Sequence, residues 1–175
     1  MDLVVVVIDP QKGWLNQYTR PTLHALAEEL SQSACWPSVV LTQFINDVAS
    51  PFRSLLPWWK GFQKADDTDL MDEFMRPVLQ MFTRNTYGLP PELWACFESH
   101  EVKQILLTGV ETDATIVKTA MDAFDRGISV WAPWHLVAST YGPAGQASGL
   151  AILQKVLGQD HLLSREATRK LLAGI

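Results

Sequence analysis

The segment 105–127, ILLTGVETDATIVKTAMDAFDRG, constrains the fold more than any other part of the chain. It begins with an apolar run typical of a buried strand, and Gly109 then allows a sharp turn. Asp113 is a plausible N-cap for a following helix, and Gly127 lies where such a helix would end. Apolar side chains recur between them at helical spacing, at Ile116, Val117, Ala120, Met121 and Phe124. The segment therefore predicts a strand, a tight turn and an amphipathic helix.

The start of this predicted helix is suited to holding an anion. The first backbone N–H groups of a helix have no intrahelical partner, and the helix dipole is positive there. Thr115 lies in the first helical turn. We expect an oxyanion site beside it, where a reactive side chain would find backbone donors already in place.

Composition bounds the class of protein. A chain of 175 residues with 47% hydrophobic residues and seven tryptophans is typical of one well-packed domain. The net charge of −5, without a basic cluster, argues against nucleic acid as a partner. Cys35 and Cys96 have no metal-binding or redox spacing, so we expect packed thiols. The chain starts with an apolar strand and has no stretch of membrane-spanning length, which favours a soluble cytoplasmic protein without a membrane partner.

Strand and helix patterns alternate along the chain. Strands are predicted at 3–8, 38–44, 78–83, 103–108, 128–133 and 161–163. Helices are predicted at 21–31, 90–100, 112–126, 144–157 and 165–172. The segment 45–77 is predicted to be irregular, apart from a short helical piece at 69–75. This alternation indicates a single α/β domain over 1–175, a Rossmann-like three-layer αβα structure with a mainly parallel sheet of about six strands.

Ligands of open α/β sheets bind beyond the carboxyl ends of the strands. Five residues follow or close predicted strands and are expected to meet at that edge: Asp9, Phe44, Arg84, Gly109 and Trp134.

Short motifs in a fixed order indicate a family. They are VIDPQ at 7–11, LTQ at 41–43, FTRNTY at 82–87, GVETD at 109–113, AMDAFDRG at 120–127 and VAS at 137–139. Together they cover nearly the whole chain, which resembles the isochorismatase-like hydrolases, also called the cysteine hydrolase superfamily. The resemblance implies an α/β hydrolase of small molecules. Relatives often form dimers or larger homo-oligomers.

The resemblance assigns three positions to chemistry. In the family an aspartate closes the first strand, a lysine follows the third, and a cysteine begins the helix after GVETD. These positions fall on Asp9, Arg84 and Thr115, so two of the three residue types are changed. The family also implies a non-proline cis peptide between Val110 and Glu111, which would aim the N–H groups of Glu111 and Thr115 into the site.

Each of the three has an alternative role. Asp9 is either a turn residue before Pro10 or the family's acid and base. Arg84 stays protonated and cannot shuttle a proton, so a counter-ion for Asp9 is favoured over a catalyst. The hydroxyl of Thr115 is a far weaker acid than a thiol, and an internal threonine has no free amine beside it. A capping or ligand-binding role is therefore favoured over nucleophilic attack.

A metal or other cofactor is not expected. Nicotinamidase-like relatives bind a metal through an aspartate and histidines just after the second strand, and 43–47 reads QFIND, without histidine. Substrate contacts are expected from Gln11, Trp14, Phe44, Glu111 and His135, with a loop role as the alternative for His135. Trp58, Trp59 and Trp134 are further candidates for the pocket wall. Core packing or a subunit interface is the other use of these aromatic residues, and a Trp58–Trp59 patch would suit burial by a partner subunit.

The sequence supports two functions. The first is a hydrolase of a small amide, ureide or vinyl ether, with Asp9 as acid and base and no cysteine nucleophile. The isochorismatases proper, which lack the cysteine and cleave a vinyl ether, are similar in this respect but keep the lysine. The second is a catalytically silent member that binds a small acid or acts as an oligomeric interaction protein, favoured by the joint loss of lysine and cysteine.

Overall fold

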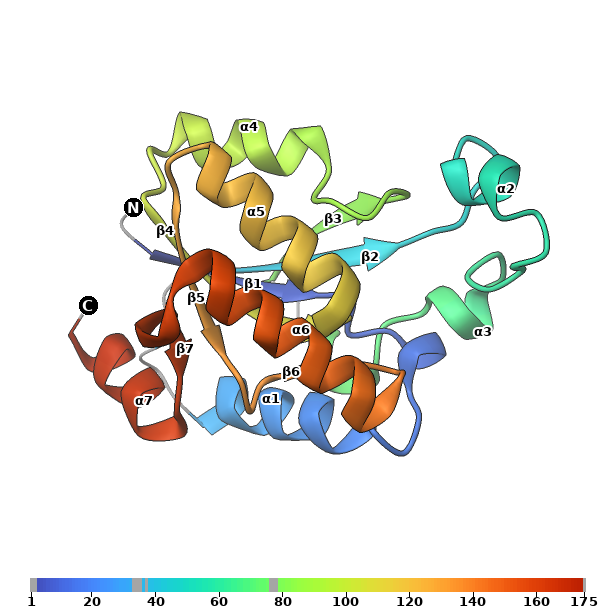
Figure 1. Ribbon diagram of the computed structural model, residues 1–175. Helices are drawn as coiled ribbons and strands as arrows, with labels where there is room; N and C mark the ends of the chain where they lie inside the picture. The colour runs from blue at the N-terminus through green and yellow to red at the C-terminus, as the bar shows by residue number, and fades with distance from the viewer. Residues whose placement is uncertain (1–2, 33–35, 37, 76–78, 175) are drawn as a thin grey trace.

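The computed structural model describes residues 3–32, 36, 38–75 and 79–174, and it contains a seven-stranded sheet with helices on both faces (Figure 1). The strands are β1 (Leu3–Ile8), β2 (Val39–Phe44), β3 (Gln80–Arg84), β4 (Gln104–Val110), β5 (Ser129–Pro133), β6 (Val137–Ala138) and β7 (Leu162–Leu163). Their order is β3-β2-β1-β4-β5-β7, with β6 also paired to β4, and each pairing is parallel. The predicted three-layer αβα class is confirmed. The additional strand, β6, has two residues, too few to give a periodic pattern.

Both faces of β1 are covered, which explains its unbroken apolar sequence. Val4, Val6 and Ile8 pack in the core beneath α4 (Pro91–Ser99), α5 (Val117–Asp125) and α6 (Gly142–Leu157). Leu3, Val5 and Val7 pack on the other face, against α1 (Arg20–Gln32) and α7 (Arg165–Ala173). Alternate residues of one strand therefore belong to two separate cores, as the two-residue period of a strand requires.

The segment between β2 and β3 is more regular than the sequence predicts. It contains two short helices, α2 (Pro51–Leu55) and α3 (Ala65–Thr68), and a 3₁₀ turn at Asp72–Phe74. Ser50 caps α2 by accepting a hydrogen bond from the N–H of Phe52. Helices of four or five residues fall below the length at which hydrophobic periodicity can be read. This segment projects beyond the carboxyl end of β2 (Figure 1).

The predicted helix 112–126 begins differently from the expectation. Thr112–Ile116 forms a π turn, and the regular helix α5 starts at Val117. Asp113 lies inside the π turn and is not the N-cap, because Glu111 occupies that position. Phe124 is 66% exposed and Met121 is 38% exposed, so neither joins the buried face predicted for them.

The end of this helix and the turn before it follow the prediction more closely. Gly127 has φ 71°, its N–H bonds Phe124 O, and the N–H of Ile128 bonds Ala123 O, so it ends α5 as predicted. The cis peptide between Val110 and Glu111 is also confirmed.

Gly109 lies within β4 and not in the turn that follows it. Its φ is 102°, and a Cβ there would lie 2.1 Å from Ile8 O in the neighbouring strand. Glycine is therefore required by close contact between the two backbones.

The remaining boundaries agree within about two residues at most helix and strand ends, the usual uncertainty of element ends. Predictions that involve Cys35 and Val78 fall outside the described residues. Cys96 is half-buried. Within the described residues, no helix has the length and apolar character needed to cross a bilayer.

Candidate functional site

Asp9 and Arg84 form a buried ion pair where three parallel strands end. Phe44 and Arg84 are paired in register on β2 and β3, and Asp9 follows the last residue of β1. Arg84 donates from Nε to Asp9 Oδ1 over 3.1 Å and from Nη2 to Asp9 Oδ2. Thr42 Oγ1 donates to the same Oδ1 over 2.6 Å and accepts the N–H of Asp9. Asp9 is fully buried and Arg84 is 4% exposed, so the carboxylate is held by three donors without contact with solvent.

The guanidinium of Arg84 also reaches Thr115, near the end of the π turn. Nη2 donates to Thr115 Oγ1 over 3.1 Å, and Nη1 donates to the carbonyl of Thr86. The Phe44 ring lies 4.9 Å from the guanidinium carbon, a cation–π arrangement. Sequence reasoning thus assembles Asp9, Arg84 and Thr115 correctly. The structure adds that Arg84 connects the other two: it bonds both Asp9 and Thr115, which have no hydrogen bond to each other.

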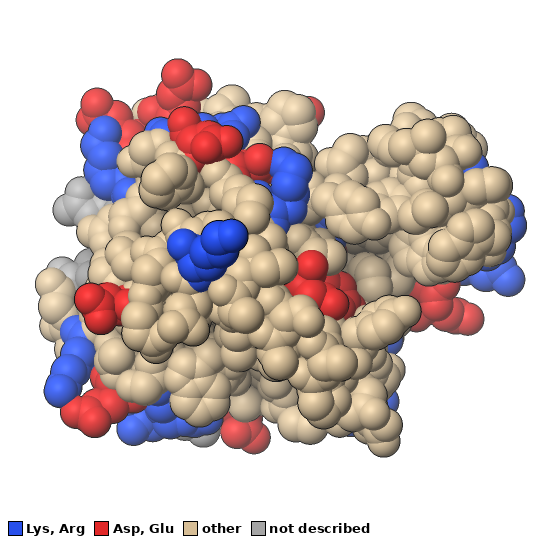
Figure 2. Space-filling model, viewed as in Figure 1, with Lys and Arg blue, Asp and Glu red and all other residues tan. Residues whose placement is uncertain are grey.

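A pocket of about 200 Å³ lies above this network. Its walls are mostly aromatic: Trp14, Phe44, Phe52, Trp58, Trp59 and Tyr87, with Leu56 and Ala114 beside them. Its polar lining comes from Arg84, Glu111 and Thr115. In the space-filling view the part of the molecule that contains α2 meets the main body along a hollow and is largely free of charge (Figure 2). The pocket has room for a group about the size of one ring, and Asp9 does not line it.

Aromatic contacts fix the walls against one another. Phe44 lies edge-on to Phe52 at 5.2 Å between ring centroids and to Phe62 at 5.6 Å, while Trp14 lies 4.1 Å from Phe62. Trp59 lies 5.3 Å from Phe52. The rings of the wall are thus packed against one another as aromatic pairs.

Glu111 is an acidic residue of the pocket lining, and one of its carboxyl oxygens has no hydrogen-bond partner among the described residues. Its side chain is 8% exposed, and Oε2 accepts the N–H of Thr140 over 2.8 Å. Oε1 is buried and has no hydrogen-bond partner among the described residues. Burial raises the pKa of this carboxyl, and the charge of Asp113 raises it further against the hydrogen bonds from Thr140 and Ser139.

Two residues predicted to contact a substrate or to form the pocket wall do not line the pocket. Gln11 is fully buried, and its amide donates to Phe44 O and Thr68 O and accepts from Phe44 N, which ties the ends of β1 and β2 to α3. It does not line the pocket. Trp134 is 50% exposed and also lies outside the pocket.

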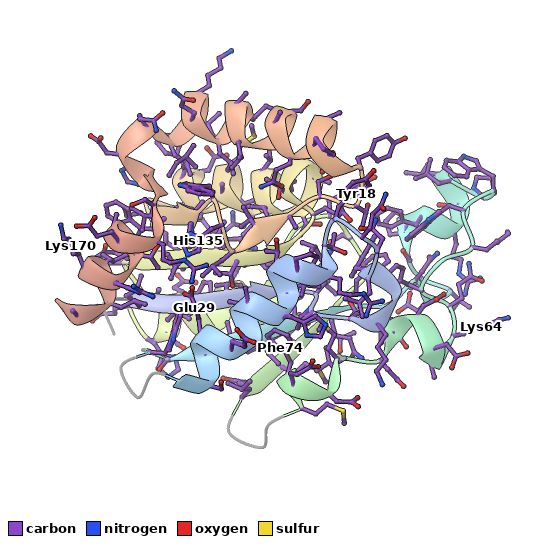
Figure 3. All side chains as sticks on the ribbon, turned by 90° about the horizontal axis from the view of Figure 1, so that it is seen from below. Tyr18, Glu29, Lys64, Phe74, His135 and Lys170 are labelled. Carbon is purple, nitrogen blue, oxygen red and sulfur yellow. The ribbon has the colours of Figure 1, made fainter. Side chains whose placement is uncertain are left out.

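His135 is placed away from the site. Its side chain is 7% exposed, lies beside α1 near Glu29, and has Nε2 3.8 Å from Glu29 Oε1 (Figure 3). Arg165 of α7 holds the same carboxylate at 2.6 Å. The strand that precedes His135 ends at Pro133, and the following turn directs the histidine to the α1 and α7 face. A position just after a strand therefore does not by itself predict that a side chain lines the pocket.

The buried His135 predicts a pH-dependent stability. Burial, with the charges of Arg165 and Arg169, lowers its pKa from 6.5 to about 4. Because the folded-state pKa lies below the unfolded value, the neutral ring favours folding, and this contribution is lost as pH falls from about 6.5 towards about 4. Between these pH values we expect the free energy of unfolding of the wild-type protein to fall by about 1–2 kcal/mol, after allowance for solvent screening. His135→Leu should not show this decrease.

The measurement is urea unfolding at pH 7 and pH 4.5 for both proteins. Ala151→Leu, at an exposed position of α6 without a titratable group, is the control and should keep the wild-type pH dependence. An equal loss in wild type and His135→Leu would contradict the assignment.

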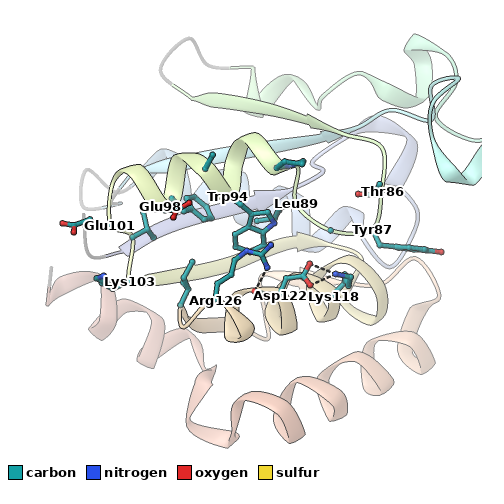
Figure 4. A pocket seen from close by; sticks show the side chains of 16 residues that line it. Thr86, Tyr87, Leu89, Trp94, Glu98, Glu101, Lys103, Lys118, Asp122 and Arg126 are labelled. Carbon is teal, nitrogen blue, oxygen red and sulfur yellow. Dashed lines mark hydrogen bonds and ion pairs between the residues drawn. The ribbon is translucent and has the colours of Figure 1, made fainter.

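A wider groove of about 1060 Å³ runs between α4 and α5, on the other side of Tyr87 (Figure 4). Three of its charged residues interact with neighbours in the groove: Lys118 pairs with Asp122, and Arg126 stacks 4.3 Å from the Trp94 ring. None of the unpartnered buried polar atoms of the described residues belongs to its lining. We therefore place the candidate site in the smaller aromatic pocket.

Some site residues were missed by sequence reasoning. Thr42 lies in the LTQ motif two residues before Phe44, so the strand period places both on one face. Tyr87 lies at the end of the FTRNTY motif. Phe52 had no signal, since it belongs to a segment predicted to be irregular. In the described part of the chain, no group of three or more His, Cys, Asp or Glu side chains is placed to hold a metal ion.

The fold and the pocket define a class: an α/β protein with an aromatic pocket beyond the carboxyl ends of its parallel strands. Residues 4–159 match the family model described as the isochorismatase domain. The chain belongs to this family. Isochorismatase domain-containing protein 2 of Bos taurus is 29% identical over 87 residues, which cover 49% of this chain and 41% of that protein. The match to that relative therefore spans less than half of its length.

Solved structures share the fold. An isochorismatase-like hydrolase from Alkaliphilus metalliredigens has a TM-score of 0.78 at 14% identity, covering 100% of both chains. Nicotinamidase from Bacillus subtilis has a TM-score of 0.73 at 16% identity, covering 94% of this chain and 99% of the other. N-carbamoylsarcosine amidase from Thermoplasma acidophilum has a TM-score of 0.72 at 17% identity, covering 90% and 94%. At these identities the similarity establishes the architecture.

Proposed function

We propose that this chain binds a small planar molecule in the aromatic pocket and that its hydrolytic centre is closed by Arg84. The observation behind this proposal is the double hydrogen bond between Arg84 and Asp9, which leaves the carboxylate buried beneath the pocket floor. A general base or acid has to reach the proton it transfers, directly or through one water. Asp9 would meet a ligand only after Arg84 had moved.

The chemistry of Thr115 supports the same proposal. Its hydroxyl accepts from the guanidinium, and none of its described contacts is with a base that could remove its proton. An internal threonine needs such a base to act as a nucleophile. Thr115 is therefore suited to hydrogen-bond a ligand.

Binding can be tested with single-ring aromatic compounds and the quenching of tryptophan fluorescence, because Trp14, Trp58 and Trp59 line the pocket. Ala114→Leu fills the pocket from its edge, and we expect it to weaken binding at least tenfold. Ala151→Leu, at an exposed position of α6, is the matched control and should bind as the wild type does. Equal binding by both variants would place the ligand elsewhere.

Hydrolysis with Asp9 as acid and base is the second candidate. It is favoured by the contacts of Arg84 with both Asp9, beneath the pocket floor, and Thr115, which lines it. Binding alone and hydrolysis are distinguished by a turnover screen over amides, ureides and vinyl ethers, with Asp9→Asn in parallel. We expect no turnover; turnover lost in Asp9→Asn would favour hydrolysis, and turnover that survives would exclude Asp9 from the reaction.

Homo-oligomer formation and a cytoplasmic location remain predictions. Trp58 is 74% exposed and Leu55 is 76% exposed, as an uncovered subunit contact would be. Trp59 packs towards Phe52 and Phe44, so it serves the pocket wall more than a shared patch.

A further inference from the structure

The charge of the pocket lining selects among possible ligands. The positive charge of Arg84 is balanced by Asp9 through two hydrogen bonds. Among the described residues, the carboxyl of Glu111 forms no ion pair, and its Oε1 has no hydrogen-bond partner. Once the paired charges of Asp9 and Arg84 are set aside, the lining is mostly aromatic, and its one remaining acidic side chain is Glu111.

A buried acceptor without a partner favours a ligand that brings a donor. Leaving such a group unsatisfied costs about 1–3 kcal/mol, more when it is charged, and a donor from the ligand would remove that cost. Aromatic faces attract cations, and six aromatic residues surround this space. A ligand carboxylate would instead face Glu111 with a like charge.

We propose that Glu111 determines the ligand's head group, and that the pocket takes a planar ring with a positively charged, N–H-donating head group, such as an amidinium, in preference to a carboxylate. This inference rests on the proposed function of the pocket. It replaces a small acid with a small base as the expected ligand. Trp14 Nε1, the other unpartnered polar atom of the lining, is an uncharged donor and does not set the sign of the ligand's charge.

Glu111 is held in a position that makes this selection possible. Oε2 accepts the N–H of Thr140, and Asn16 donates to the carbonyl of that same residue over 3.0 Å. One carboxyl oxygen is thus anchored to the loop before α6 and the other remains free to accept. Glu111→Gln keeps the shape and one acceptor but removes the charge.

Three probes of matched shape test the inference: benzamidine, benzamide and benzoate. We expect benzamidine to bind at least tenfold more tightly than benzoate to the wild-type protein, with benzamide between them. Glu111→Gln should weaken benzamidine at least tenfold and change benzamide little. Glu166→Gln, an exposed carboxyl of α7, is the matched control and should preserve the wild-type order.

The pH dependence gives an independent readout on the unmodified protein. Benzamidine stays protonated near neutral pH, so its affinity should rise with pH as Glu111 ionises, and Glu111→Gln should flatten this dependence. If Glu111→Gln does not fold, the wild-type profile decides: a flat or falling affinity would overturn the inference.

The outcomes separate the inference from the function on which it rests. If none of the three probes binds, the pocket is not a site for single-ring ligands, and the proposed function fails. If the probes bind but benzoate equals or exceeds benzamidine, the pocket stands and the role of Glu111 is rejected. An unchanged order in Glu111→Gln would reject it as well.

Discussion

Asp9→Asn is expected to lower the free energy of unfolding by about 3 kcal/mol. The substitution leaves the buried guanidinium of Arg84 without its counter-charge, and breaking one side of a buried ion pair typically costs about 3–5 kcal/mol. The lower end applies because the amide oxygen of asparagine can still accept from Arg84. Asparagine is chosen because residue 9 has φ 49°, a conformation that Asn tolerates better than an apolar residue. Chemical denaturation at pH 7 measures the loss.

The double variant Asp9→Asn with Arg84→Met is the control. It removes both charges, and replacement of a whole buried pair is often close to neutral. We expect it to regain most of the lost stability. A double variant less stable than Asp9→Asn alone would show that the contacts of Arg84 with Thr86 and Phe44 matter more than the pair.

Thr115→Cys is expected to give a thiol that small electrophiles alkylate about tenfold faster at pH 7 than an ordinary cysteine. Arg84 Nη2 lies 3.1 Å from the oxygen that sulfur would replace, and a neighbouring guanidinium stabilises the thiolate. The pocket gives the reagent access, since Thr115 lines it. Iodoacetamide labelling followed by mass spectrometry measures the rate at this position, with the wild type as background for Cys35 and Cys96.

Two further variants show whether Arg84 is the cause. Adding Arg84→Met should return the labelling rate of Thr115→Cys to that of an ordinary thiol. Asp9→Asn should also slow it, because Asp9 holds the guanidinium in place. A thiol that stays inert in all three backgrounds would mean that the pocket is closed to small reagents.

The order of strands and helices could be predicted because each long element has a period that its own residues reveal. β1 is apolar throughout since two helical layers cover it, and α5 alternates buried and exposed sides. β6 and the short helices between β2 and β3 could not be found this way. They are too short for a repeated pattern to be read from them, and they form through tertiary contacts, such as the pairing of Val137 with Gly109.

The site was predictable where it depends on strand ends. Asp9, Arg84 and Thr115 follow from the parallel register and the family motifs, because parallel strands finish at one edge. The direction of a side chain after a strand end was not predictable. His135 and Glu111 both follow strands, but the turn after Pro133 directs the first to α1, and only the second lines the pocket.

The source of the pocket walls has a consequence for how such a protein can change. Phe52, Leu56, Trp58 and Trp59 come from the single excursion between β2 and β3, whereas Arg84 and Thr115 come from the sheet edge and the turn after it. Exchanging that excursion for another would alter which molecules fit while the polar floor kept its geometry. One part of the apolar wall and the polar floor are thus encoded in separate stretches of sequence, and the size of the pocket can change without a change in its polar residues.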